Sequence, residues 1–264
     1  MVRTYGQEPY QAEVIHGGPR AFGSVALVAR ELSKQIGVLE PIQSKHSIEE
    51  LVQELYEQLR CYTKKPITLI GHSWGAWLVL IFARNYPEMV KQLILVGCGP
   101  IKAEYTHLIM EHRLSNLSKE DGELFLKSIE QLNDSTFNDK DTALSNLGRM
   151  AEKADHYAPS GVEENPKDSF ETDGSMYADV WPQADALRSS GELFSLLADI
   201  HCPVTLIQGE FDPHPYEGVE EPLREQGVSF QAYRLEKCGH TPWQEKYAKD
   251  QFYKILCNII LSDS

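Results

Sequence analysis

The sequence predicts an α/β fold in which a mostly parallel, doubly wound sheet receives one helical insertion. Short apolar runs alternate with amphipathic helical stretches in residues 1–100, and the alternation resumes in residues 200–264. Such alternation is typical of parallel sheets that carry helices on both faces. Residues 101–199 are polar and helix-like, and they contain no strong strand pattern. We therefore expect a core built from residues 1–100 and 200–264, with residues 101–199 forming a helical cap, or lid, over the sheet edge.

The expected elements follow one another in order. One or two short strands fall within residues 4–15, and Ser47 and Glu50 form a capping box that begins a helix. The other expected core strands are 38–39, 67–70, 91–96, 203–208 and 229–235. The other expected core helices are about 24–35, 76–86, 217–226 and 245–261. Within the insertion we expect helices near 104–116, 118–133, 141–156 and 184–197, and an exposed loop over 165–174.

Composition and charge disfavour several classes of protein. The 264 residues contain no run of ~18 apolar residues and begin without the apolar stretch of a secretory signal. The net charge of −14 disfavours nucleic acid and membrane surfaces as partners. Residues 101–199 hold 20 acidic against 9 basic side chains, and so carry most of this charge. The five scattered cysteines have neither disulfide-framework nor zinc-ligand spacing, so we expect a cytoplasmic location. We also expect a soluble monomer or homodimer.

The pentapeptide Gly71-His72-Ser73-Trp74-Gly75 is the feature around which the expected site is built. It lies between the strand at 67–70 and the helix at 76–86. A serine on a sharp strand-to-helix turn is typical of a G-x-S-x-G nucleophile elbow. Because strand and helix nearly touch there, the positions two before and two after the serine must be small.

Three candidate catalytic residues each follow an expected parallel strand: Ser73, Asp212 and His240. In open parallel sheets, side chains at the carboxyl ends of strands gather at one edge. We expect Ser73 as nucleophile, His240 as its base, and Asp212 as the acid that orients His240. Glu210 is a rival for the acid, although the alternation of strand residues points it elsewhere. Read singly, Asp212 is also a common turn residue before a proline.

Two backbone N–H groups are expected to form an oxyanion hole. The residue after the nucleophile, Trp74, supplies one, and Gly18 supplies the other, because Pro19 has no N–H. We expect His72 to orient the elbow or line the pocket. His214 is expected at the rim of the site.

The chain resembles the α/β-hydrolase superfamily over essentially its full length, and three of its motifs are similar to the proline iminopeptidase-like subgroup. These motifs are His16-Gly17-Gly18-Pro19, the pentapeptide, and Gly239-His240-Thr241-Pro242-Trp243. The resemblance implies the Ser73, Asp212 and His240 triad, the Gly18 and Trp74 oxyanion hole, and no metal or organic cofactor. The pocket is then expected to be lined by His16, Gly17, His72 and Trp243.

Three departures separate the chain from that subgroup. Proline iminopeptidases carry an Asp-Gln-Arg-Gly loop where this chain has the unrelated connection 39–44. Arg20 replaces the glycine that follows the oxyanion loop. The segment before that loop is short, so we expect a reduced N-terminal hairpin.

We therefore expect a serine hydrolase that acts on a small-molecule ester, amide or thioester through an acyl-enzyme. The alternatives are an aminopeptidase of proline iminopeptidase type, a lyase, or a ligand receptor on the same fold. The acidic cap suggests recognition of a substrate amine, although charge runs usually form a solvated face. The candidate carboxylates are Glu163, Glu164, Asp168, Glu171 and Asp173.

Overall fold

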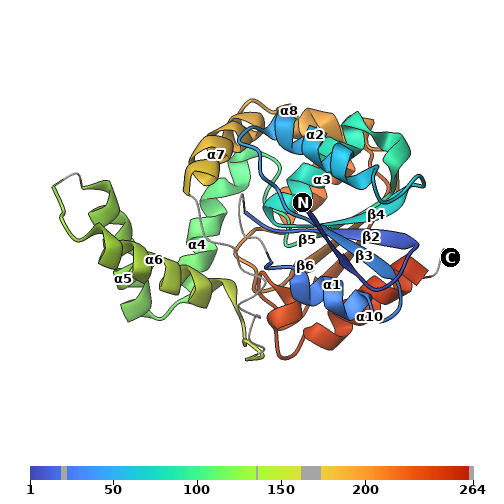
Figure 1. The fold of residues 1–264 in the computed structure, drawn as a ribbon. Helices are drawn as coiled ribbons and strands as arrows, with labels where there is room; N and C mark the ends of the chain where they lie inside the picture. Colours follow the sequence, from blue (N-terminus) through green and yellow to red (C-terminus); the bar gives the residue numbers. More distant parts are fainter. Residues whose placement is uncertain (19–22, 135, 162–173, 262–264) are drawn as a thin grey trace.

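The computed structural model describes residues 1–18, 23–134, 136–161 and 174–261, in which one seven-stranded sheet carries helices on both faces (Figure 1). The strand order is β1-β3-β2-β4-β5-β6-β7, and only β1 runs antiparallel to its neighbour in this described sheet. The strands are β1 (Val2–Tyr5), β2 (Tyr10–Ile15), β3 (Gly37–Pro41), β4 (Ile67–His72), β5 (Val90–Val96), β6 (Val204–Gly209) and β7 (Phe230–Leu235). The expected fold class is therefore confirmed.

The N-terminal hairpin is reduced, as the short leading segment predicts. β1 pairs with β3, with Val2 opposite Pro41, and β3 lies between β1 and β2. The two strands of this segment therefore form no hairpin with each other, and β1 is a single antiparallel strand at the sheet edge.

Helices cover both faces of the sheet because each one buries an apolar stripe. On one face, α1 (Ala26–Leu32) and α10 (Lys249–Leu261) pack through a cluster that includes Val28, Leu32 and Phe252. On the other face lie α2 (Ile48–Leu59), α3 (Trp74–Asn85) and α9 (Glu217–Glu225). At the start of α2 the hydroxyl of Ser47 accepts the backbone N–H of Glu50, as the capping box predicts.

The centre of the sheet is the most deeply buried part of the protein. Every residue of β4 and β6 is buried, and these strands are accordingly almost continuous apolar runs. The following helix, α3, is buried around nearly its whole circumference. The strand and helix that flank Ser73 are thus held rigidly on all sides.

The chain between β5 and β6 forms five α-helices in its described part, and they divide into two groups. α4 (Thr106–Asn116) is followed by α5 (Lys119–Asn133) and α6 (Lys140–Asp155), and α5 and α6 pack on each other and project from the body (Figure 1). A small separate cluster, which includes Leu117, Phe125 and Met150, holds this hairpin together.

The second group, α7 (Gly174–Ser189) and α8 (Glu192–Ser195), belongs to the main core. Val180, Ala184 and Leu193 are buried in the same cluster as α2 and α3. The single helix expected at 184–197 is two helices in the structure: α7 begins at Gly174, contains Pro182 and ends at Ser189, and α8 follows Gly191, whose φ is 80°. Of the loop expected over 165–174, residues 165–173 lie outside the described residues.

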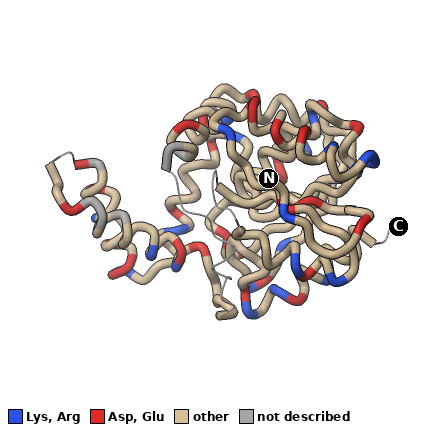
Figure 2. The backbone as a smooth tube through the Cα atoms, viewed as in Figure 1, with Lys and Arg blue, Asp and Glu red and all other residues tan. Residues whose placement is uncertain are grey.

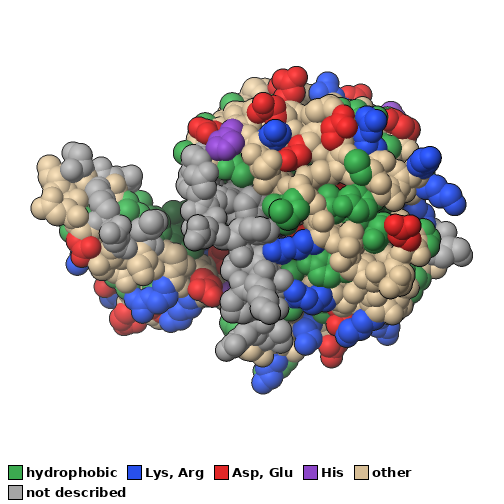
Figure 3. Space-filling view, viewed as in Figure 1, with side chains coloured by type: hydrophobic (Ala, Val, Ile, Leu, Met, Phe, Trp, Pro, Cys, Tyr) green, Lys and Arg blue, Asp and Glu red, His purple; other side chains and the backbone are tan. Residues whose placement is uncertain are grey.

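Charges of both signs are spread over the described surface. Figure 2 shows acidic residues on the body and on the projecting hairpin, and Figure 3 shows basic and acidic side chains close together on the visible face. No helix among the described residues is long and apolar enough to cross a membrane. All five cysteines are unpaired.

Candidate active site

Ser73 stands at the junction of β4 and α3 in a backbone conformation that is rare for a residue with a side chain. Its φ is 52° and its ψ is −115°. A Cβ atom at Gly71 would lie 2.3 Å from the carbonyl oxygen of Gly75, and one at Gly75 would lie 2.6 Å from that of Ile15. The elbow therefore requires both glycines. Such strain at a non-glycine residue costs about 1–3 kcal/mol, and is characteristic of functional sites.

Asp212 lies three residues beyond the end of β6, in a loop that is tied to the loop after β7. The backbone N–H of Phe211 donates to the carbonyl of Cys238 at 2.8 Å, and a Cβ atom at Gly209 would lie 2.2 Å from that same carbonyl. This close approach brings Asp212 beside His240 across the ends of two neighbouring strands.

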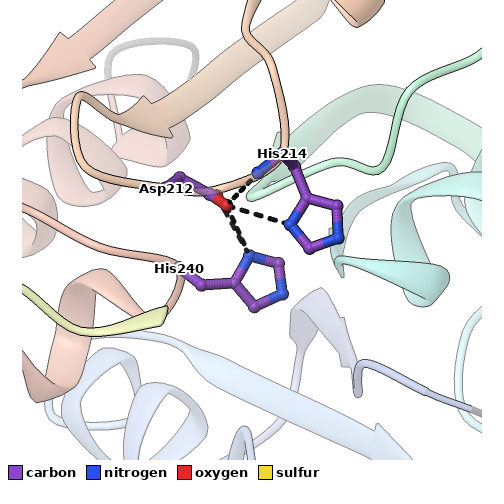
Figure 4. A group of neighbouring side chains, drawn as sticks. All are labelled: Asp212, His214 and His240. Atoms are coloured by element: carbon purple, nitrogen blue, oxygen red, sulfur yellow. Dashed lines mark hydrogen bonds and ion pairs between the residues drawn. The ribbon is translucent and has the colours of Figure 1, made fainter. Parts of the chain in front are cut away.

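His240 and Asp212 are in direct contact, as Figure 4 shows. The Nδ1 atom of His240 lies 3.1 Å from Oδ1 and 3.0 Å from Oδ2 of Asp212, whose side chain is fully buried. The rival acid Glu210 is exposed, so the structure brings Asp212 to the histidine. With Nδ1–H donating to the carboxylate, the Nε2 atom of His240 is left as a proton acceptor.

Each member of the Asp212–His240 pair favours the charged form of the other, the carboxylate of Asp212 and the imidazolium of His240. Burial raises the pKa of Asp212, but His240 and His214 outweigh that effect, and the net pKa lies below the ordinary value. Burial lowers the pKa of His240, but the attraction of the Asp212 carboxylate outweighs it, and the net pKa is raised. Asp212 is therefore ionised, and it stabilises a proton on His240.

A cavity of about 450 Å³ opens above Ser73. Four of the residues predicted for the site line it, namely Gly18, Ser73, Trp74 and His240. Among the described hydrogen bonds of the His240 ring, all go to Asp212 and none to Ser73. Such catalytic contacts commonly tighten only when substrate is bound.

Both predicted oxyanion donors are at this cavity. Trp74 is the first residue of α3, where backbone N–H groups have no partner within the helix. Gly18 has a φ of 59°, in the left-handed region that favours glycine. A Cβ atom at the neighbouring Gly17 would lie 3.1 Å from the Cβ of Ser73, so this loop passes directly over the elbow.

His16, Gly17, His72 and Trp243, which we expected to line the pocket, are buried and do not belong to the described cavity wall. His72 donates from Nε2 to the carbonyl of His240 at 3.0 Å, and its ring packs edge-on against Trp243. His16 directs Nδ1 to the carbonyls of Gly17 and Gly18, and burial lowers its pKa to about 4. The two histidines therefore hold the backbone of Gly17, Gly18 and His240 in place.

His214 has a closer relation to the site than the sequence indicates. Its Nδ1 atom and its backbone N–H both lie 2.9 Å from Oδ1 of Asp212, and its ring stacks on His240 with centroids 4.4 Å apart. Its side chain is mostly buried and faces the cavity. In the sequence, only its position two residues after Asp212 indicates this contact, because a loop residue at that spacing can turn back onto the carboxylate.

The other cavity residues come from elements that carry no motif. Aromatic and apolar side chains form most of the wall, and two arginines face it: Trp77, Pro100, Ile109, Met110, Trp181, Arg113 and Arg188. The helices α4 and α7 contribute most of this set. Their helical spacing is readable in the sequence, but which face turns toward Ser73 is decided by packing.

Asp212, His214 and His240 also place three potential metal ligand atoms within 4.8 Å of one another. Two imidazoles and one carboxylate are a set that can hold a transition metal. Here the same Nδ1 atoms point at the carboxylate at hydrogen-bonding distance (Figure 4). The two histidines can therefore be held close to Asp212 by N–H groups that both donate to its carboxylate.

Comparisons with known proteins agree with this architecture. A putative 2-succinyl-6-hydroxy-2,4-cyclohexadiene-1-carboxylate synthase from Bacillus subtilis is 26% identical over 71% of this chain and 63% of its own length. The solved structure of VinJ matches with a TM-score of 0.73 at 18% identity, over 99% of this chain and 94% of that one. A proline iminopeptidase from Mycobacterium smegmatis matches with a TM-score of 0.70 at 15% identity, over the same shares.

The curated relatives are matched over only part of their lengths, between 24% and 63% for three of them. The family model for the alpha/beta hydrolase fold matches residues 39–240, which is most of the chain. This match includes the Ser73 elbow, the loop of Asp212 and His240. The chain belongs to the alpha/beta hydrolase fold family.

Proposed function

We propose that the protein is a serine hydrolase that cleaves a small ester, amide or thioester through an acyl-enzyme on Ser73. One observation carries the proposal: a strained serine shares a cavity with a histidine whose Nδ1–H is held by a buried, ionised Asp212. Membership of the hydrolase family supports it. A 450 Å³ cavity suits a small-molecule substrate.

In the first half-reaction, Nε2 of His240 takes the proton of the Ser73 hydroxyl while Oγ bonds to the substrate carbonyl carbon. The carbonyl oxygen becomes an oxyanion, which the backbone N–H groups of Gly18 and Trp74 stabilise. Collapse of this intermediate breaks the bond to the leaving group, and His240 returns the proton to it. Water then repeats the sequence on the acyl-enzyme and releases the acid and free Ser73.

A non-hydrolytic reaction is the second candidate, because the similar Bacillus subtilis protein is a putative synthase. The two candidates differ in where the product's oxygen comes from. Ester hydrolysis in ¹⁸O-labelled water places one labelled oxygen in the product acid, whereas a reaction without water addition leaves the product unlabelled.

The aminopeptidase alternative has less support from the cavity. Its described wall carries two arginines and no Asp or Glu side chain, which is unsuited to a substrate ammonium group. The acidic candidates at 163, 164, 168, 171 and 173 lie outside the described residues.

Labelling with a fluorophosphonate tests the proposal directly. We expect one phosphonylated serine, identified as Ser73 by peptide mass spectrometry, and loss of labelling in Ser73→Ala and His240→Ala. Ser195→Ala removes an exposed serine on α8 and should label normally. Unlabelled wild-type protein, or equal labelling of Ser73→Ala, would overturn the mechanism.

A further inference from the structure

Two arginines face the cavity above Ser73, although the protein carries a net charge of −14. Arg113 extends from α4, and Arg188 from the last turn of α7. Within the described cavity wall no carboxylate offsets them. The charge that each arginine presents to the cavity therefore depends on its own ion pair.

Arg113 is already neutralised. Its Nε and Nη2 atoms donate to the two carboxylate oxygens of Asp155, both at 2.8 Å. This is the bidentate geometry in which a guanidinium binds a carboxylate most strongly. The carbonyl of Asp155 also accepts the backbone N–H of His240 at 2.7 Å, so the pair anchors the His240 loop. Arg113 therefore has a structural partner.

Arg188 is only partly neutralised. Its side chain is 10% exposed, and Nη2 donates to Asp185, a residue whose own side chain is 52% exposed. The guanidinium lies over the ring of Trp77, 5.3 Å from its centroid. The Nε–H is buried and donates to no described group. Arg188 nevertheless lines the cavity wall, and a charge offset only by a half-exposed carboxylate can still attract an anionic group of a ligand.

Arg188 and Ser73 line the same cavity, and Trp77 lies between them. Trp77, over which the guanidinium lies, follows Ser73 by four residues, which is about 6 Å along the axis of α3. The ring of Trp181 lies parallel to that of Trp77, with centroids 6.4 Å apart. An apolar chain of a few carbons along this aromatic wall would join a scissile carbonyl at Ser73 to an anion at Arg188.

We propose that the cavity selects substrates that carry a carboxylate a short apolar chain away from the scissile bond, with Arg188 as the group that binds the carboxylate. This inference rests on the proposed hydrolysis at Ser73. A carboxylate suits the site because a single planar guanidinium that is already paired with one carboxylate matches one further negative charge better than two. A phosphate dianion would need further free donors, and Arg113 has none to spare at its Asp155-bound edge.

Two matched substrate pairs test the selection. The first is the 4-methylumbelliferyl half-ester of adipic acid and its methyl ester, in which the acyl chain ends in a carboxylate or a neutral group. The second is 4-butyryloxybenzoate and its methyl ester, in which the leaving group carries the charge. We expect wild-type protein to favour the anion in at least one pair, by about tenfold or more in kcat/KM.

Arg188→Gln should bring the ratio of kcat/KM for the anionic substrate to that for the neutral one close to one. Asp185→Asn leaves the guanidinium charge in place, so it should preserve or raise this ratio. Arg60→Gln is the matched control. Arg60 also follows an acidic partner by three residues and lies over an aromatic ring, but it is exposed and distant from the cavity wall. A ratio near one in wild type for both pairs, or an equal loss on both members of a pair in Arg188→Gln, would overturn the proposal.

Calorimetry separates this inference from the proposed reaction. In Ser73→Ala, monomethyl adipate should bind and dimethyl adipate should bind at least about tenfold more weakly, with no difference in Ser73→Ala/Arg188→Gln. This result does not require turnover, so it stands or falls independently of the fluorophosphonate labelling. Equal binding of both esters to Ser73→Ala would refute carboxylate selection even if Ser73 is the nucleophile.

Discussion

The Nδ1 atom of His240 lies 3.0 Å from the nearer carboxylate oxygen of Asp212, although 28 residues separate the two in the chain. The loops after β6 and β7 hold this contact, since parallel neighbouring strands end at the same edge of the sheet. The contact selects one tautomer of His240 and directs its Nε2 atom away from the carboxylate.

Asp212→Asn should lower kcat by about a thousandfold or more, because an amide cannot stabilise the imidazolium or hold the required tautomer. Steady-state kinetics on an activated ester would measure this loss. Glu210→Gln is the matched control, since Glu210 lies two residues away and is exposed. The opposite pattern, with activity lost in Glu210→Gln and kept in Asp212→Asn, would reassign the acid.

The pH dependence of kcat/KM should show an acid limb with its midpoint above 6.5, because Asp212 raises the pKa of His240 and only the neutral ring accepts a proton. The raised pKa also stabilises the folded protein while His240 is protonated. That contribution is complete below the unfolded pKa and is lost as pH rises through the folded pKa. In Asp212→Asn the limb should move to lower pH. An unchanged midpoint in that variant would show that another group titrates.

Glu245→Gln should weaken both stability and turnover. The buried Glu245 carboxylate accepts the backbone N–H groups of Gly239, Tyr157 and Ala158 at 2.8–3.0 Å, which fastens the His240 loop to the chain after α6. An amide offers one acceptor oxygen fewer, so we expect the free energy of unfolding to fall by about 1–3 kcal/mol. Thermal denaturation and kcat would be measured together. Glu236→Gln, at an exposed position nearby, should change neither.

Glu13→Gln should stabilise the protein at alkaline pH. Glu13 on β2 is fully buried, and both of its carboxylate oxygens lack a hydrogen-bond partner among the described residues. Burial raises its pKa from 4.5 to about 8. The folded state therefore keeps a proton that the unfolded chain releases, and stability falls as pH rises from 4.5 to 8.

The free energy of unfolding of Glu13→Gln should therefore exceed that of wild type only slightly at acid pH. Near pH 8 the difference should reach a few kcal/mol, because each unit of pKa difference corresponds to about 1.4 kcal/mol. Denaturant unfolding across this range would measure it. Glu8→Gln, at an exposed position that precedes the same strand, should show no such trend. A constant difference at every pH would mean that Glu13 does not titrate in the folded state.

Treatment with EDTA or 1,10-phenanthroline should leave ester hydrolysis unchanged, because the proposed reaction uses Ser73, His240 and Asp212 without a metal. Activity would be followed before and after dialysis, with zinc, manganese and iron(II) added back separately. Loss on chelation that a metal restores would assign the cluster of Asp212, His214 and His240 a ligand role instead.

The sequence by itself determined the sheet and the place of the elbow. Local rules predict the strand at 67–70, the helix after Ser73 and the need for the two glycines around it. The spacing of apolar residues identifies a strand or helix, and the sharp turn between them leaves no room for larger side chains, so both depend only on neighbouring residues. The positions of Asp212 and His240 at strand ends were also readable, since parallel strands share a direction. The same reasoning placed β2 at 12–15 without indicating that Glu13 inside it is a buried acid.

Only the tertiary structure decided what surrounds Ser73. His16, His72 and Trp243 occur in or beside the motifs but turn inward, whereas Arg188 and Trp181 occur in no motif and face the cavity. α7 packs on the core and α5–α6 projects, although both belong to the same polar stretch. The physical reason is that a local pattern defines an element, whereas the face that the element turns to Ser73 results from packing contacts between residues far apart in the chain.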